Sequence, residues 1–111
     1  MFQQFRLPVD DAPELVFSGH LIVRVTSSPE ARADNFSRHV GRWVELALYR
    51  TDGGRYVCHE VRRSARAGDP KRRDRADIVS TDASVIAFFK QTRLAERLYL
   101  EAGIAKPQRV R

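Results

Sequence analysis

A glycine-rich turn between two strand-like segments limits the possible folds of this chain more than any other feature. Residues 40–50 and 55–63 are rich in β-branched and aromatic side chains, and Asp52, Gly53 and Gly54 lie in the segment that joins them. Asp-Gly and Gly-Gly pairs accept the positive φ angles that tight hairpin turns require. The sequence therefore predicts an antiparallel hairpin, with its turn at either Asp52-Gly53 or Gly53-Gly54.

The two turn positions imply different registers of the hairpin. The earlier turn sets Glu45 opposite Glu60, and the later turn sets it opposite Arg62 instead. We favour the later turn, because like charges directly opposite each other on neighbouring strands are destabilising. In both registers one face carries the apolar side chains that we expect to form the core, which are Val44, Leu46, Leu48, Val57 and Val61.

Further strand and helix signals flank the hairpin. Residues 15–26 alternate apolar and polar side chains, which predicts a half-buried strand, and Gly19 marks a bulge or a close approach of another backbone. Residues 77–80 predict a short further strand. Thr81 offers a helix N-cap, and Gly103 has the place of the residue that ends a second helix. Four apolar side chains of these helices are expected on the core face, namely Phe88, Phe89, Leu94 and Leu98.

Strands followed by helices indicate an α+β fold. We expect an antiparallel β-meander of three to four strands, with two short C-terminal helices packed on one face. A chain of 111 residues has the size of one domain. The expected organisation is an irregular N-terminal arm at 1–14, a single domain at 15–105 that includes a basic loop at 64–75, and a tail at 106–111.

The composition argues against several classes of protein. Cys58 is the only cysteine, so no disulfide forms within the chain, and one Cys with three His supplies too few ligands for a common zinc site. No apolar run approaches the ~20 residues of a membrane span, and the N-terminus lacks the pattern of a signal peptide. We therefore expect a cytoplasmic protein with no metal, no cofactor and no membrane partner.

The basic charge is concentrated in one segment. The chain has 20 Lys and Arg against 14 Asp and Glu, and 7 of the basic residues lie between positions 62 and 75. Gly68, Asp69 and Pro70 favour turns, so this segment is predicted to be a loop. Such a loop can bind nucleic-acid phosphates or an acidic protein surface, or it can simply be solvated. The seven residues are Arg62, Arg63, Arg66, Lys71, Arg72, Arg73 and Arg75.

A second candidate binding surface is the other face of the hairpin. Trp43, Tyr49 and Tyr56 share this face in both registers, and Arg50 and Arg55 flank them. Aromatic rings interleaved with arginine suit the stacking of single-stranded bases, and equally suit a protein interface. The alternative is that this face belongs to the core, or that Phe2 and Phe5 of the N-terminal arm cover it.

Cys58 and His59 are the candidates for a small enzyme. Neighbouring residues of a strand point to opposite faces, so these two side chains cannot hydrogen-bond to each other. A lone cysteine on a strand is usually an inert small apolar residue, and His59 on the apolar face is more simply explained as a hydrogen-bonded core residue. We therefore expect a non-catalytic protein, with a small enzyme using Cys58 or His59 as the third possibility.

Two stretches resemble parts of a group of small proteins. Residues 43–57 and 94–104 are similar to segments of small uncharacterised proteins encoded by bacterial plasmids, integrated elements and phages. The resemblance implies a setting in mobile DNA and implies no activity and no site residues. Proteins from such elements commonly bind host machinery, including defence systems.

The leading hypothesis is thus a small basic binding module. It would dock nucleic acid or a nucleoprotein through the arginine-rich loop and the aromatic face. The alternative is an anti-defence inhibitor, of the anti-CRISPR type, that acts by binding a host protein or complex. A homodimer formed through an exposed edge strand is compatible with a sheet of so few strands.

Overall fold

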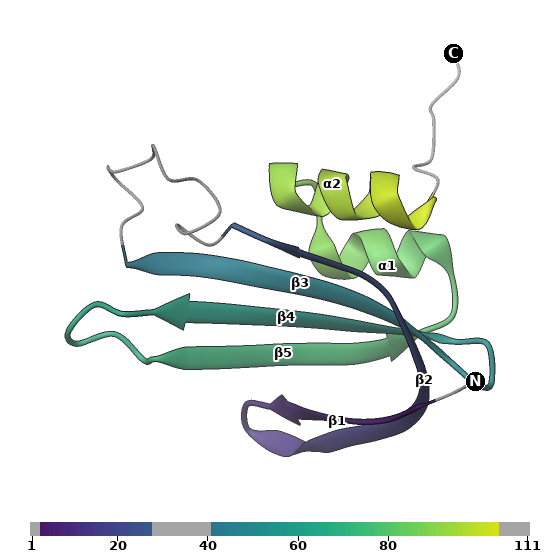
Figure 1. The fold of residues 1–111 in the computed structure, drawn as a ribbon, viewed down its shortest axis with the longest axis horizontal. Coiled ribbons are helices and arrows are strands. Elements are labelled where there is room, and N and C mark those ends of the chain that lie inside the picture. The colour runs from purple at the N-terminus through teal and green to yellow at the C-terminus, as the bar shows by residue number, and fades with distance from the viewer. Residues whose placement is uncertain (1–2, 28–40, 105–111) are drawn as a thin grey trace.

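The computed structural model describes residues 3–27 and 41–104, which form a five-stranded antiparallel sheet followed by two helices (Figure 1). The sheet has the strand order β1-β2-β3-β4-β5, so each strand pairs with its neighbours in the chain. The elements are β1 (Gln3–Val9), β2 (Ala12–Thr26), β3 (Arg42–Thr51), β4 (Tyr56–Ser64), β5 (Arg72–Val79), α1 (Asp82–Phe89) and α2 (Arg93–Ala102). The predicted α+β class is confirmed, but the expected three to four strands are five.

The extra strand is β1, so the expected irregular arm at 1–14 is wrong for residues 3–14. Phe5 and Leu7 alternate with polar residues, and their side chains pack in a cluster with residues of the other strands. Proline disrupts a strand least at an edge, and Pro8 lies in this edge strand, where the pairing with β2 shifts between Leu7 and Val9. Of the terminal segments, residues 1–2, with Phe2, and the predicted tail at 106–111 lie outside the described residues.

Strand β2 is bent, and the bend gives the sheet a concave face. Gly19 pairs with Gln3 of β1 on one side and with Thr51 of β3 on the other. A Cβ atom at Gly19 would press on the carbonyl oxygen of Arg50 and lie 2.9 Å from the Thr51 Cα atom, which confirms the predicted close approach of another backbone. Beyond this point the N-terminal half of β2 carries β1 under the sheet (Figure 1). There the Asp10 backbone N–H donates to the Asp74 carbonyl oxygen of β5 at 3.0 Å.

The β3–β4 hairpin is confirmed, but neither predicted register is correct. Its loop has three residues rather than two, because Thr51 pairs with Arg55 through the Thr51 N–H and the Arg55 carbonyl oxygen at 2.8 Å. Gly54 has a φ of 87°, as the last residue of such a loop requires. The register therefore lies midway between the two predictions and sets Leu48 opposite Cys58 and Glu45 opposite Val61.

The corrected register divides the predicted core face into two separate cores. On the side covered by the helices, which we call the helix-side face, Val44, Leu46 and Leu48 pack with Cys58. Val57 belongs instead to the concave face, where it clusters with Leu7, Ala47 and Tyr49 beside Phe5, Leu15 and Phe17. Val61 also lies on the concave face, where it lines a cavity. A one-residue slip of register exchanges the two faces of a strand, which explains why the expected grouping of Val57 and Val61 with Leu48 is wrong.

Helix α1 begins and helix α2 ends where the sequence predicts. The Thr81 hydroxyl accepts from the Ser84 N–H at 3.1 Å at the start of α1. Gly103 follows α2 in the left-handed conformation, and the Ile104 N–H donates to the Tyr99 carbonyl oxygen at 2.9 Å. The expected packing on the sheet is also confirmed, since Phe88, Phe89 and Leu98 are buried in the helix-side core and Leu94 is half-buried against it.

The predicted basic loop at 64–75 is shorter than expected. Residues 72–75 belong to β5, which pairs along its length with β4, so the loop comprises only residues 65–71. The short strand predicted at 77–80 corresponds to residues 77–79, which are the end of this longer strand. The β4–β5 loop lies at the end of the sheet beyond the helices (Figure 1).

Candidate nucleic-acid interface

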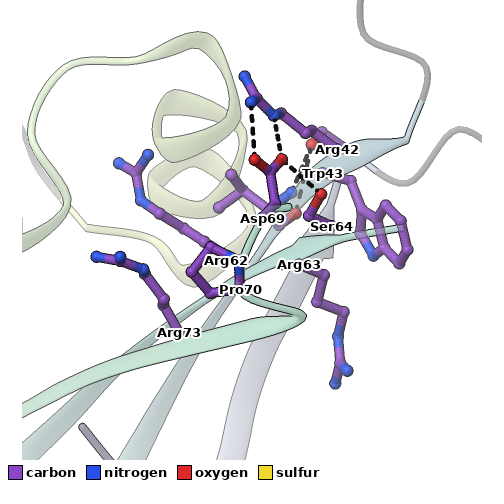
Figure 2. Close-up of a pocket in the computed structure, with 10 residues that line it drawn as sticks. Arg42, Trp43, Arg62, Arg63, Ser64, Asp69, Pro70 and Arg73 are labelled. Carbon is purple, nitrogen blue, oxygen red and sulfur yellow. Dashed lines mark hydrogen bonds and ion pairs between the residues drawn. The ribbon is translucent and has the colours of Figure 1, made fainter. Parts of the chain in front are cut away.

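Two pairs of arginines face each other across the end of the β4–β5 hairpin. The register sets Arg62 directly opposite Arg73, and Arg63 directly opposite Arg72. The side chains of Arg62 and Arg73 extend to the same side, away from Arg63 (Figure 2). Like charges in directly opposed positions destabilise a sheet. The repulsion between the paired arginines at this end of the sheet therefore lowers the stability of the folded protein.

The pair on the helix-side face is only partly neutralised. Glu60 lies 3.7 Å from Arg62 and 3.1 Å from Arg75, so one carboxylate serves two guanidinium groups. Arg75 is further held by the Phe88 carbonyl oxygen, which accepts at 2.9 Å, and it lies 4.0 Å from the centre of the Phe88 ring. Arg73 forms no ion pair with any residue in the described ranges, and the Arg62 side chain is 66% exposed. Arg62 and Arg73 are thus open to an anionic ligand, whereas Arg75 joins the sheet to α1.

A carboxylate ties the loop at 65–71 to the sheet. Asp69 accepts from Arg42 at 2.8 and 3.2 Å and from the Ser64 hydroxyl at 2.8 Å (Figure 2). The hydrogen bonds from Arg42 and Ser64 hold the pKa of Asp69 below its ordinary value. Arg66 and Lys71 are exposed in this loop and form no ion pair with a described residue. A cavity of about 560 Å³ lies beside Asp69, and its lining includes Trp43, Pro70, Arg62 and Arg73.

The expected aromatic face does not form, because the corrected register places Tyr49 and Tyr56 on opposite faces. Tyr49 is 2% exposed and packs against the rings of Phe5 and Phe17, at centroid distances of 4.8 and 5.3 Å. The alternative that Phe5 covers this face is therefore confirmed for Tyr49. On the helix-side face the Tyr56 hydroxyl donates to Asp82 at 2.9 Å.

The other members of the expected aromatic face are also dispersed. The Arg50 guanidinium lies 4.6 Å from the centre of the Tyr56 ring and donates to the Gly54 carbonyl oxygen at 3.1 Å. Arg55 is exposed beside the turn. Trp43 is half-buried at the far end of β3, opposite Arg63. The structure therefore brings Arg50 and Tyr56 together and leaves Trp43 apart from both.

A buried histidine–aspartate pair lies on the concave face, and sequence reasoning missed its second member. The His59 Nε2 atom lies 2.8 Å from Asp74, whose carboxylate also accepts from Arg72 at 2.6 and 2.9 Å. Burial lowers the pKa of His59, and the charges of Arg72 and Arg24 add to this effect and outweigh Asp74. The imidazole is thus neutral near pH 7. Beside it, Arg63 donates to Glu45 at 3.0 Å.

Cys58 points away from this pair into the helix-side core, as expected for a neighbour on the same strand. The thiol is fully buried, and burial, followed by the charge of Asp77, raises its pKa to about 12. We expect Cys58 in the folded protein to react with iodoacetamide at pH 8 at least roughly 100-fold more slowly than in urea, because the thiolate is the reacting form. Mass spectrometry over a time course measures both rates. Equal rates would show that the thiol is accessible and place it back among the candidate nucleophiles.

Comparisons with known proteins add no assignment: no family model, no curated protein and no solved structure matches this chain. The resemblance to proteins of plasmids and phages thus stays a prediction. Among residues 3–27 and 41–104 there is no group of three or more side chains arranged to hold a metal ion. Within the same ranges no helix is long and apolar enough to cross a membrane.

Proposed function

We propose that this protein is a non-catalytic module that binds the phosphate backbone of nucleic acid. The observation that carries the proposal is the register of β4 and β5, which opposes Arg62 to Arg73 at the exposed end of the sheet. Arg66 and Lys71 of the adjoining loop extend the same basic surface. We call these four residues the outer basic cluster.

The electrostatics of the outer basic cluster favour a polyanion as the partner. Asp69 is engaged by Arg42 and Ser64, and Glu60 is shared between Arg62 and Arg75. The carboxylates within reach are therefore already occupied. Phosphate groups spaced along a backbone would separate and neutralise the opposed guanidinium groups, and a guanidinium binds phosphate oxygens in a bidentate manner.

The proposed binding is insensitive to base sequence. The aromatic face that would have stacked bases is absent, with Tyr49 buried under Phe5 and Phe17. Contacts to phosphates position a nucleic acid without reading its bases. We therefore expect both single strands and duplexes to bind, with an affinity that depends on salt concentration and charge density.

Fluorescence anisotropy with a labelled random-sequence duplex tests this proposal. The affinity should fall by orders of magnitude between roughly 50 and 200 mM salt, because bound phosphates release counterions at about 0.9 per contact. The double variant Arg62→Gln/Arg73→Gln should bind more weakly. Its plot of log affinity against log salt should be flatter by about 2 in slope.

A control variant that loses the same number of positive charges elsewhere distinguishes the effect of local phosphate contacts from the effect of net charge. Arg93 and Arg97 are exposed on α2, and within the described residues the ion pair of Arg97 is with Glu101 of its own helix, at 3.6 Å. Arg93→Gln/Arg97→Gln should keep most of the affinity and the slope. If this control weakens binding as much as the β4–β5 variant does, or if the wild type does not bind at low salt, the proposal is wrong.

A further inference from the structure

We propose that the cavity on the concave face is a binding site for a phosphate monoester of about nucleotide size. This site is separate from the outer basic cluster, and the inference does not rest on the proposed function. The cavity measures about 460 Å³, which lies within the range of small-molecule sites. The residues that decide its chemistry are Arg6, Arg24, Arg63 and Arg72, with Glu45 and His59.

The arginines converge on the cavity from different strands. Arg6 comes from β1, Arg24 from β2, Arg63 from β4 and Arg72 from β5, so the curled sheet alone brings them together. Three of them have carboxylate partners, which are Glu14 for Arg6, Glu45 for Arg63 and Asp74 for Arg72.

Arg24 is the guanidinium that lacks a carboxylate. Within the described residues it forms no ion pair, and it donates a hydrogen bond to the Tyr49 hydroxyl at 3.3 Å. Arg24 is exposed at the rim of the cavity. A guanidinium with only a neutral partner can form charge-assisted hydrogen bonds to an anionic ligand beside it. The Tyr49 hydroxyl accepts a hydrogen bond from Arg24 and can at the same time donate its own proton to the anion.

The position of His59 favours a phosphate monoester over a phosphate diester as the ligand. The Asp74 carboxylate accepts from both of its partners, so the neutral imidazole carries its proton on Nε2 and has a free lone pair on Nδ1. Nδ1 has no hydrogen-bond partner among the described residues. Every buried side-chain nitrogen or oxygen atom of these residues does have a partner, so Nδ1 is not buried. We take it to face the cavity that His59 lines. The monoanionic form of a phosphate monoester, which loses its last proton in a second ionisation near pH 6, has a P–OH group that can donate to Nδ1. A backbone phosphodiester has no such proton.

The remaining wall of the cavity suits the organic part of the ligand. Leu7, Ala47 and Val61 are buried apolar residues that line it beside the Tyr49 ring. Apolar walls with a few convergent polar groups are typical of sites for small organic ligands. The shared chemistry is therefore a terminal phosphate on an organic group, carried either by a free nucleotide or by the phosphorylated end of a strand.

Isothermal titration calorimetry of the full chain with adenosine 5′-monophosphate, at low salt, is the first test. We expect binding of the monophosphate and none of adenosine. The methyl ester of the same phosphate should bind more weakly than the monoester itself. Arg24→Gln should lower the affinity roughly 10-fold or more, since a charge-assisted hydrogen bond is lost. Arg62→Gln/Arg73→Gln is the matched control and should bind the monophosphate as the wild type does.

A second arm distinguishes the two sources of the phosphate. In the Arg62→Gln/Arg73→Gln background, an oligonucleotide with a 5′-phosphate is compared with the same oligonucleotide ending in a 5′-hydroxyl group. A preference for the phosphorylated end, without binding of the free nucleotide, supports the site and assigns it to strand ends. Absence of both the nucleotide binding and this preference overturns the inference, as does equal binding of the monoester and its methyl ester. Failure of the proposed function alone would leave nucleotide binding intact.

Discussion

Replacing Gly19 with alanine is expected to cost about 3–5 kcal/mol of folding stability, which is among the largest effects of single substitutions. The added Cβ atom would meet the carbonyl group of Arg50 and lie 2.9 Å from the Thr51 Cα atom. These are backbone atoms of the paired strand β3, so no side-chain rotation relieves the clash. Strands β2 and β3 would have to separate at the point where β2 bends. Urea denaturation, followed by Trp43 fluorescence and by circular dichroism, measures the loss.

Gly53→Ala is the matched control for this substitution. The nearest atom to a Cβ at Gly53 is the Thr51 hydroxyl oxygen at 3.8 Å, and the φ angle of Gly53 is outside the left-handed region. We expect the midpoint of denaturation to stay close to that of the wild type. Comparable losses at the two glycines would mean that the contact between Gly19 and β3 does not set the path of β2.

Asp74→Ala is expected to cost about 3 kcal/mol, because it removes one partner of a buried charged network. The Asp74 carboxylate accepts three hydrogen bonds, one from His59 and two from Arg72. Its removal leaves the Nε2–H of His59 without an acceptor, in a side chain that is 8% exposed. Asp77→Ala on the same strand is the control, since Asp77 is exposed, and it should lower stability far less.

The loss caused by Asp74→Ala should depend on pH. Burial acts to raise the pKa of Asp74, but the hydrogen bonds from Arg72 and His59 outweigh it and place the pKa below its ordinary value. Such a carboxylate stabilises the folded state above the pKa of the unfolded chain, and this contribution is lost as the pH falls through the folded pKa. The difference between wild type and variant should therefore shrink below about pH 4. A difference that stays constant to pH 2 would argue against an ionised Asp74.

The parts of the fold that local sequence determines were predictable. The turn glycines define the β3–β4 hairpin, and Thr81 and Gly103 mark helix ends through local hydrogen bonds. The register was not predictable, because a three-residue loop ending at Gly54 lies between the two-residue alternatives. Strand β1 was missed because proline argues against a strand, whereas at an edge it removes no sheet hydrogen bond.

The candidate site was predictable in its composition and not in its geometry. The seven basic residues are visible in the sequence, but the β4–β5 register decides that Arg62 and Arg73 share one face while Arg63 and Arg72 share the other. The same pairing brings Asp74 to His59. Nothing local to either residue indicates this contact, since it depends on how two strands align and on the burial that the curled sheet provides.

The order of the strands also bears on how the molecule assembles. Each strand pairs with the one before it in the chain, so each pairing step closes only the connection between two consecutive strands. The contact from Asp10 to Asp74 is different, because it joins the first strand region to the last and requires the strands between them to be in place. The β3–β4 hairpin can thus form early. The concave cavity takes shape only when β1 and β5, the first and last strands of the sheet, come into contact.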